Sequence, residues 1–250
     1  MKKRFNKKRF KKIIRASLTV SLVLCITFSG WAQSTEANNA LNIGFGAKIG
    51  TTISTFTNEQ PHSNSLQGLK AGVFANYSFN ENMAVQIEAE YSQEGGRLLY
   101  HDVPYLVGQD TWYNLDIENQ ELVLHNVNIP ILFKYTLSLK NFDVVGLIGP
   151  DVGYNITAIA NKEGTVFTEV GGFNTYKSSE DVSSNIENFN VAATAGLGIE
   201  IPAGKFDLLI DVRYRYGFTS VYNSYSYIGI PQINGDLRNH TMSFTLGVGF

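Results

Sequence analysis

The sequence has a single cysteine, Cys25, and no apolar run long enough to form a membrane-spanning helix. Such a helix needs about 20 consecutive apolar residues, and the longest candidate, residues 16–28 (ASLTVSLVLCITF), is shorter. No segment of useful length has helical periodicity. The chain is therefore not expected to cross a membrane as helices, and beyond Cys25 it can form no disulfide and carry out no thiol chemistry.

Basic residues are scarce outside the N-terminus. Residues 1–32 contain nine of the 20 Lys and Arg residues and no acid. The rest of the chain has eleven bases against 22 acids, a net charge of −11. An acidic body of this kind argues against nucleic acid as a partner.

The first 32 residues have the pattern of a cleaved secretory signal. A basic segment precedes the short apolar run, and Gly30 and Ala32 place small residues at the −3 and −1 positions of a cleavage site. Cleavage is expected between Ala32 and Gln33. A lipoprotein would instead be lipidated at Cys25, but residues 22–24 lack the small side chains of such a site. The expected organisation is a signal over 1–32, a short polar lead over 33–41 and one domain over 42–250.

Strict alternation of apolar and polar residues is the main signal in that domain. In residues 206–218 (FDLLIDVRYRYGF), every even-numbered position is apolar or aromatic, and the odd-numbered positions are mostly charged. Alternate side chains of a strand lie on opposite faces, so this segment predicts a strand with one apolar and one ionic face. The alternation recurs in seven further segments, namely residues 42–55, 68–79, 83–94, 120–137, 142–156, 188–201 and 238–250.

The connections between these segments alternate in length. Three are tight turns, at residues 80–82, 138–141 and 202–205, and four are long, at 58–67, 95–119, 157–187 and 219–237. The polar face of the predicted strands is rich in glycine and other small residues, which suit the inside of a narrow barrel. Aromatic residues are concentrated at the strand ends. We therefore predict an all-β, eight-stranded antiparallel transmembrane β-barrel with short periplasmic turns and long extracellular loops. The alternative is a secreted lipocalin-like barrel, in which the two faces would be inverted.

Charged residues on the inward parity define the first candidate site. We predict that Glu88 and Glu90 reach Arg213 and Arg215 across the interior, because their strands lie opposite each other in a ring of eight and the lumen is only wide enough for side chains to fill. The full candidate lumen network is Glu88, Glu90, Lys134, Asp211, Arg213 and Arg215. Two interpretations remain open, a plug that satisfies buried charge and a gated path for ions or protons.

The histidines offer little support for catalysis. His62, His101, His125 and His240 fall in loops or near strand ends, form no recognisable catalytic motif and lack metal-ligand spacing. The sequence also has no phosphate-binding glycine motif. We expect no enzyme activity, no metal and no cofactor. A lipid A-modifying enzyme remains as an alternative.

Four short motifs resemble one family. Residues 128–135 (NIPILFKY), 146–150 (GLIGP), 211–217 (DVRYRYG) and 246–250 (LGVGF) look like the PorT-like, or "porin family", outer-membrane β-barrel proteins of Bacteroidetes. The resemblance covers most of the chain after the signal. It implies location in the outer membrane, in contact with its lipid, and membership of an envelope or secretion complex. It also implies that the C-terminal Phe250 acts as the signal read by the barrel-assembly machinery.

The long connections suggest how such a barrel would act. Residues 100–113 and 222–227 carry several Tyr and Trp side chains, which are favoured at protein interfaces. The expected function is a non-enzymatic structural or interaction protein of the envelope, with a plugged lumen and loops that contact other envelope proteins. A narrow passive pore is the main alternative.

Overall fold

The computed structural model describes residues 43–57, 63–107, 111–167, 173–221 and 237–250. The expected signal, the polar lead and the cleavage site between Ala32 and Gln33 lie outside these residues, as do His62 and residues 222–227. Among the residues that are described, no helix is long and apolar enough to cross a membrane.

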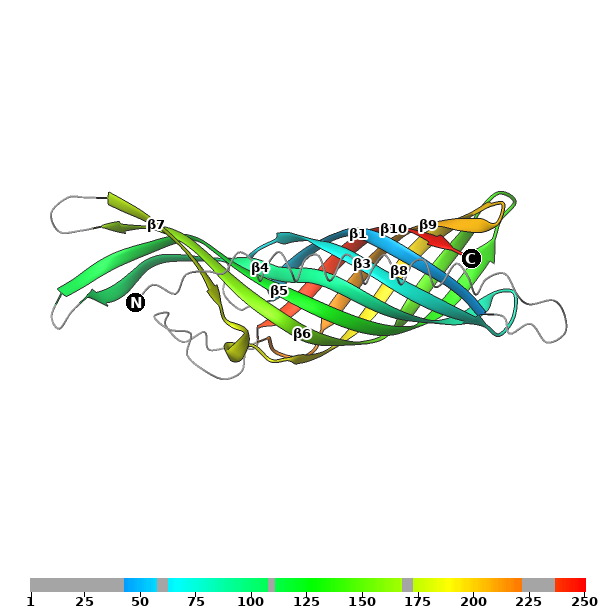
Figure 1. The fold of residues 1–250 in the computed structure, drawn as a ribbon, viewed down its shortest axis with the longest axis horizontal. Coiled ribbons are helices and arrows are strands. Elements are labelled where there is room, and N and C mark those ends of the chain that lie inside the picture. Colours follow the sequence, from blue (N-terminus) through cyan, green and yellow to red (C-terminus); the bar gives the residue numbers. More distant parts are fainter. Residues whose placement is uncertain (1–42, 58–62, 108–110, 168–172, 222–236) are drawn as a thin grey trace, which may run out of the picture. The chain divides into compact units, whose positions relative to one another are not determined.

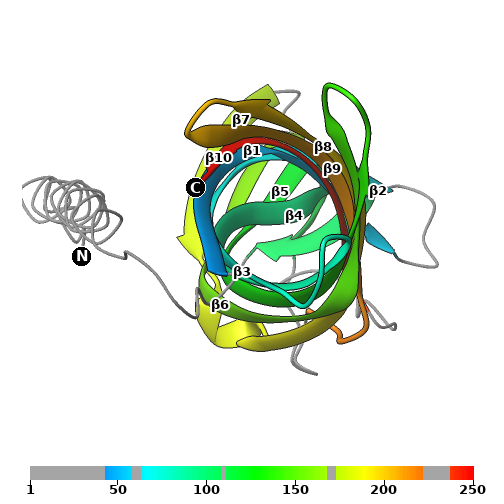
Figure 2. The ribbon, with the colours of Figure 1, turned by 90° about the vertical axis from the view of Figure 1, so that its right-hand side faces the viewer.

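Eight long strands close into an antiparallel barrel (Figures 1 and 2). Each strand pairs with the next one in chain order, and the last pairs with the first. The predicted all-β, eight-stranded fold is therefore confirmed. The barrel strands are β1 (Ile43–Thr57), β3 (Leu66–Ser78), β4 (Met83–Val107), β5 (Thr111–Ser138), β6 (Asp143–Phe167), β8 (Phe189–Ala203), β9 (Phe206–Gly217) and β10 (Arg238–Gly249).

The apolar face of each strand lies outside the barrel and the ionic face lies inside. In β9, Val212 and Tyr214 are exposed, whereas Arg213 between them is only 3% exposed. The same alternation continues around the ring, with Leu197 of β8 being 69% exposed. A soluble barrel would bury its apolar face, so the lipocalin-like alternative is wrong.

The tight turns lie together at one end of the barrel, here called the turn end, and the long connections lie at the other, the loop end. At the β3–β4 turn, the Asn80 side-chain oxygen accepts hydrogen bonds from the backbone amides of Asn82 and Met83, both at 2.9 Å. At the β8–β9 turn, Gly204 has a φ of +79°, a conformation that glycine adopts without a steric penalty. Local chemistry therefore fixes these predicted turns.

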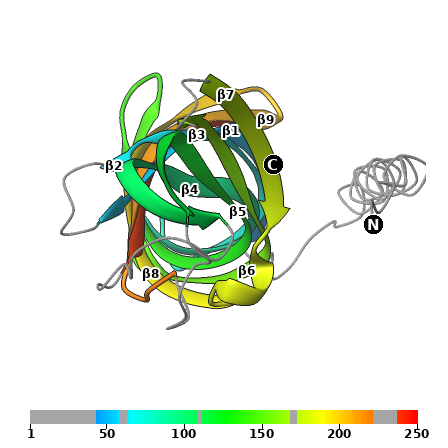
Figure 3. The same ribbon diagram turned by 90° about the vertical axis from the view of Figure 1, so that its left-hand side faces the viewer.

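The long connections differ from the prediction. Most of residues 95–119 and 157–187, expected to be loops, form strand instead, because β4 pairs with β5 as far as Val107 and Thr111. β6 continues to Phe167 and pairs with the additional strand β7 (Phe173–Asp181). Glycines and a proline in these segments suggested loops, but Gly95, Gly96 and Pro104 are paired with β5, and the register shifts of this ladder fall between Leu98 and Val103. We call residues 98–107, 111–120, 159–167 and 173–181 the strand extension (Figures 1 and 3).

Two short elements complete the described part of the loop end. β2 (Ser63–Asn64) pairs with β4 at Leu98 and Arg97. The 3-10 helix η1 (Ser183–Asn185) follows β7 and leads back towards β8. Figure 3 views the barrel from the end that carries the strand extension.

Two belts of aromatic side chains surround the apolar exterior. One row lies near the turn end and the other near the loop end, and along β9 the belts are about ten residues apart, from Phe206 to Tyr216. This is the length of a strand that crosses a bilayer, and such belts mark the two membrane interfaces. The exposed members are Phe45, Tyr77, Phe79, Phe133, Tyr135, Phe142, Phe206 and Phe250 at the turn end, and Tyr91, Tyr154, Phe189, Tyr214, Tyr216 and Phe218 at the loop end.

Candidate functional site

The centre of the lumen holds a cluster of buried ion pairs, which we call the central ion cluster. Arg213 Nη1 donates hydrogen bonds to both carboxylate oxygens of Glu88, at 2.7 and 2.9 Å, and Arg213 Nη2 donates to Asp211 Oδ2 at 3.2 Å. The structure thus brings together Glu88 and Arg213 from opposite walls. The members of the cluster are Lys48, Lys70, Glu88, Glu90, Asp211 and Arg213, all at most 7% exposed.

Two lysines that were not in the predicted network complete this cluster. Lys48 Nζ pairs with Glu88 and lies 2.6 Å from Glu90 Oε1, while Lys70 Nζ lies 2.8 Å from Glu90 Oε2. Glu90 therefore neutralises lysines, and its distance to the nearest Arg213 nitrogen is 3.9 Å. Lys48 lies on the inward-facing side of β1 and Lys70 on that of β3, so the alternation in the sequence could have placed both lysines in the lumen.

A second group of buried charges lies nearer the loop end, and we call it the upper ion cluster. Arg215 Nε donates to Asp151 Oδ2 at 3.0 Å, Nη1 donates to Glu94 Oε2 at 3.4 Å, and Nη2 donates to the side-chain oxygen of Asn190. The predicted contact between Arg215 and the Glu88–Glu90 pair is replaced by these partners. The sequence pattern predicts that a strand ends at Glu94, but β4 continues to Val107 and the Glu94 side chain is only 1% exposed.

Lys134 lies apart from both ion clusters. Its ammonium group donates to Glu200 Oε1 at 2.6 Å, towards the turn end of the lumen. The predicted inclusion of Lys134 in one network with Arg213 is therefore wrong. Its position near the end of β5 places it towards the turn end, where its ion-pair partner, Glu200, comes from β8.

Inward-facing glycines make room for the long charged side chains. Gly196 is the cross-strand partner of Arg213, and a Cβ at Gly196 would lie 2.6 Å from Arg213 Cγ and 2.8 Å from the carbonyl oxygen of Val212. Gly72 and Gly247 stand opposite Lys48 in the same way. The inward-facing glycines thus have a packing function, because so narrow a barrel has no room for a second side chain opposite a long charged one.

We expect Gly196→Ala to destabilise the barrel by about 1–3 kcal/mol, the usual cost of overpacking a filled interior. Gly146→Ala is the matched control, because the nearest atom to a Cβ at Gly146 is 4.0 Å away. Urea unfolding of both variants in lipid vesicles measures the difference. Equal stability of the two variants would contradict the assigned packing role.

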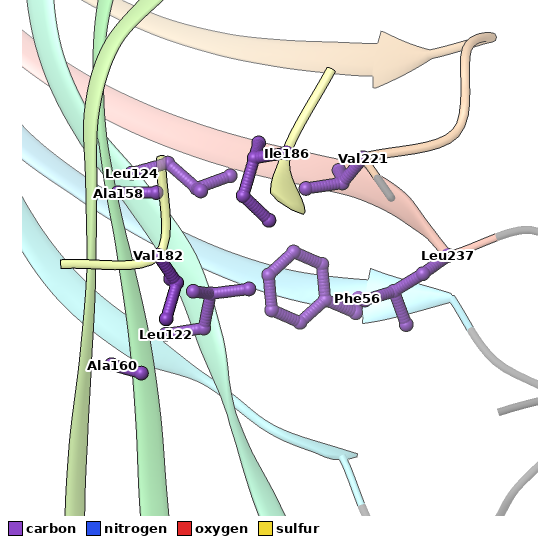
Figure 4. Packing of buried hydrophobic residues seen from close by; sticks show 9 residues of the cluster. All are labelled: Phe56, Leu122, Leu124, Ala158, Ala160, Val182, Ile186, Val221 and Leu237. Atoms are coloured by element: carbon purple, nitrogen blue, oxygen red, sulfur yellow. The ribbon is translucent and has the colours of Figure 1, made fainter. Parts of the chain in front are cut away.

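A cluster of buried apolar side chains, which we call the apolar plug, lies at the loop end of the barrel (Figure 4). Phe56 of β1 lies among Leu122 of β5, Val182 and Ile186 beside η1, and Leu237 before β10, all nearly fully buried. The leucines of β5 that broke the polar parity in the sequence belong to this plug and to a smaller cluster below it. The complete plug is Phe56, Leu122, Leu124, Ala158, Ala160, Val182, Ile186, Val221 and Leu237.

Phe74 fills the turn end of the lumen. It stands on the polar parity of β3 and is 5% exposed. Its ring packs against the backbone of Gly46, where a Cβ would lie 2.1 Å from Phe74 Cζ. The described interior thus holds the ion clusters at its centre, Phe74 and the Lys134–Glu200 pair towards the turn end, and the apolar plug at the loop end.

Asp181 holds the η1 segment against the plug. Asp181 Oδ1 accepts hydrogen bonds from the Ser183 amide at 3.0 Å and the Ser183 hydroxyl at 2.5 Å, while the hydroxyl oxygen accepts from the Ala158 amide at 2.9 Å. The hydrogen bonds from Ser183 lower the pKa of the Asp181 carboxyl.

This lowered pKa predicts a local response to acid. The charged form of Asp181 is favoured in the folded state, so its contribution to stability is full above the unfolded pKa and is lost as pH falls through the lower, folded pKa. In an NMR titration, the Ser183 amide shift should report a midpoint below the ordinary aspartate value, and Ser183→Ala should raise the Asp181 pKa. A midpoint at or above the ordinary value would contradict the assignment.

The histidines with described side chains bond to tyrosines of the loop-end belt. Tyr91 Oη and His125 Nδ1 are 2.7 Å apart, and Tyr214 Oη and His240 Nδ1 are 2.9 Å apart. His101 lies in β4. Within the described ranges, no group of three or more His, Cys, Asp or Glu side chains is arranged to hold a metal ion.

Phe250 lies at the turn end, where the barrel closes. Its backbone exchanges hydrogen bonds with Phe45, at 3.0 Å from the Phe45 amide and at 2.7 Å from its own amide. Its side chain is 70% exposed on the outer face, within the turn-end belt. The C-terminal residue is therefore part of the barrel wall.

A closed barrel with a lipid-facing exterior, two aromatic belts and an ion-paired interior defines an outer-membrane β-barrel protein. The chain belongs to the outer membrane protein beta-barrel domain family, whose sequence model matches residues 31–223. No curated protein matches the chain.

Solved structures of outer-membrane proteins match at low sequence identity. Neisserial surface protein A is 11% identical with a TM-score of 0.39, covering 82% of this chain and 95% of that one. A major outer membrane protein from Thermus thermophilus is 12% identical with a TM-score of 0.40, covering 83% and 98%. Ail, the attachment invasion locus protein of Yersinia pestis, is 13% identical with a TM-score of 0.35, covering 83% and 98%.

Proposed function

We propose that this protein is a non-enzymatic interaction protein of the outer membrane. Its lumen is closed by its own side chains, and it acts through the strand extension on the extracellular side. The observation that carries the proposal is the filled interior, in which the central ion cluster lies between the apolar plug and Phe74. Such an interior favours a structural role over passive diffusion.

The strand extension is the feature best suited to contact a partner. By register, Tyr105 of β4 stands beside Tyr113 of β5, and Leu115 of β5 stands between Val103 of β4 and Val166 of β6. By register these positions share one face of the sheet, and aromatic residues are enriched at protein interfaces, whose fully buried centre is more apolar than the rest. Residues 100–107 and 111–113, which hold most of the aromatic residues of this segment, therefore belong to paired strands, and their register brings apolar positions together.

The PorT-like resemblance suggests which partners to seek. It supports an envelope or secretion complex as the setting of this barrel and recognition of Phe250 by the barrel-assembly machinery. The residue pattern of 1–32 supports a secretory signal cut between Ala32 and Gln33. His125 and His240 form hydrogen bonds with tyrosines of the loop-end belt, which favours a non-enzymatic role over lipid A modification.

Removing the tip of the strand extension tests the interaction. We expect that replacing residues 99–118 with a two-residue Asn-Gly turn leaves a folded, heat-modifiable barrel, because the ion clusters and the plug lie below that segment. In a cross-linked pull-down from intact outer membrane, the wild type should retain envelope proteins that the shortened variant loses. Identical captured proteins for both would contradict a role for the β4–β5 part of the extension.

Single-channel recording tests the closed lumen. The wild-type barrel in planar bilayers should give no stepwise conductance, because side chains occupy its cross-section. Regular openings would support the pore instead.

Comparing lipid A by mass spectrometry with and without the protein tests the enzyme alternative, and unchanged lipid A is expected.

A further inference from the structure

A short excursion interrupts the chain that runs along one edge of β6. β6 pairs with β8 as far as Tyr154 and with β7 from Ile159 onwards. Only residues 155–158 of β6 lie between these two ladders, whereas the neighbouring chain uses residues 182–188 to pass from β7 to β8. We call residues 182–188, which include η1, the strap. The strap is longer than the gap that it bridges.

The strap buries two apolar side chains in the apolar plug and leaves polar ones outside. Val182 and Ile186 are 7% and 4% exposed and lie beside Phe56 (Figure 4). Ser184 and Glu187 are exposed. Because the strap has residues to spare, it can lift away from the plug without breaking either ladder. Segments with few buried contacts open locally at a lower free energy than the ladders around them.

Hydrogen bonds near its two ends hold the strap down. At the start, the Ser183 hydroxyl accepts a hydrogen bond from the Ala158 amide at 2.9 Å and donates one to Asp181 Oδ1. At the end, the Glu187 amide donates to the Val221 carbonyl oxygen at 2.9 Å. The hydroxyl of Ser183 thus joins the strap to both β6 and β7, and it acts as a latch.

A small chamber lies beneath the strap. Its volume is about 20 Å³, which is enough for one water-sized particle. Glu187 of the strap lines the chamber, together with Glu94, Asn155 and Arg215 from the barrel strands. The strap therefore lies where the upper ion cluster comes closest to the loop end, and lifting it exposes that cluster.

We propose that the strap is a hinged lid over the upper lumen. It opens towards the loop end while the barrel ladders and the central ion cluster keep their structure. In the open state, Val182 and Ile186 leave the plug, and solutes at the loop end reach the chamber and Arg215. The lumen below stays filled, so opening the lid does not by itself create a pore. The lid does not depend on the proposed interaction function.

Cysteine accessibility tests the lid, because the only cysteine of the chain, Cys25, lies in the expected signal. Asn155→Cys places a thiol in the chamber wall of the refolded mature barrel in detergent. Mass spectrometry follows the reaction of this thiol with a charged methanethiosulfonate reagent. Ser183→Ala removes the latch hydroxyl and should speed the reaction about tenfold, as expected for the loss of two hydrogen bonds. Ile186→Ala removes a buried anchor of the strap and should speed it at least as much.

The matched control is Ser184→Ala. The Ser184 hydroxyl donates to the Asn185 side-chain oxygen at 2.8 Å, within the strap itself, so its loss should leave the reaction rate unchanged. Thr245→Cys supplies a second thiol, at the level of the central ion cluster. Thr245 is 3% exposed and is the cross-strand partner of Asp211, so this thiol should stay protected when the latch is removed.

Two results would overturn the lid. In the first, Ser183→Ala speeds the reaction of Asn155→Cys no more than Ser184→Ala does, which would mean that the strap does not control access. In the second, Ser183→Ala speeds the reaction of Thr245→Cys by the same factor, which would mean that the whole barrel opens. Acceleration at Asn155→Cys alone supports a lid that moves by itself.

Discussion

Replacing Arg213 with alanine is expected to destabilise the barrel by about 3–5 kcal/mol and to produce measurable conductance. Arg213 is 3% exposed and binds Glu88 with two hydrogen bonds of 2.7 and 2.9 Å. Its removal leaves Glu88 and Asp211 without their arginine, and breaking a buried ion pair costs far more than the pair itself contributes. Alanine also leaves a gap at the level where Gly196 faces Arg213.

A second arginine provides the control for this experiment. Arg97 also forms an ion pair, with Glu121 at 2.8 Å, but its side chain is 45% exposed. Arg97→Ala should therefore cost no more than about 1 kcal/mol and should leave the bilayer silent. Urea unfolding in vesicles and single-channel recording measure both effects. If Arg213→Ala matched Arg97→Ala in both, the central ion cluster would not hold the lumen closed.

Placing an arginine on the outer face should reveal how deeply each position lies in lipid. Leu197 is 69% exposed and lies midway between the aromatic belts, where Leu197→Arg should cost about 2–4 kcal/mol. Phe189 is equally exposed, at 68%, but belongs to the loop-end belt. Phe189→Arg should cost only about 0–1 kcal/mol beyond lost packing, because charge is tolerated near the interface.

The comparison of these two variants depends on depth rather than exposure. Folding yield into phosphatidylcholine vesicles, followed by urea titration, gives both free energies. A similar cost at both positions would be inconsistent with a membrane-facing exterior whose hydrophobic band lies between the belts. Refolding without lipid or detergent supplies a further check, because the wild type should aggregate there.

The wall of the barrel was predictable because its signal is local. Alternation in segments such as residues 206–218 assigns each side chain to a face without knowledge of the partner strand. The extensions of β4, β5 and β6 were not predictable in the same way. Gly95, Gly96 and Pro104 are common in loops, and only pairing with a distant strand turns these stretches into ladders.

The contents of the lumen were predictable in type but only partly in pairing. Parity places Glu88 and Arg213 inside, and the ring of eight places them opposite each other. Which carboxylate neutralises which cation depends on register and on side-chain length. Lys48 and Lys70 form the ion pairs with Glu90. Arg215, predicted to pair with Glu88 and Glu90, forms ion pairs with Glu94 and Asp151. The inward leucines and Phe74 broke the polar pattern because they cap the lumen, a role that appears only in three dimensions.

The pair formed by Glu88 and Arg213 joins residues 125 positions apart in the sequence. When β4 has been made, Lys48 is already present to pair with Glu88, but neither Arg213 nor Arg215, which forms the ion pair of Glu94 across the lumen, yet exists in the growing chain. An incomplete sheet therefore exposes uncompensated charge along its concave side, and lipid strongly disfavours such a surface. Insertion and final closure are thus coupled into one step. A chain ending before β9 is expected to stay protease-sensitive when mixed with vesicles, whereas the complete chain becomes protected.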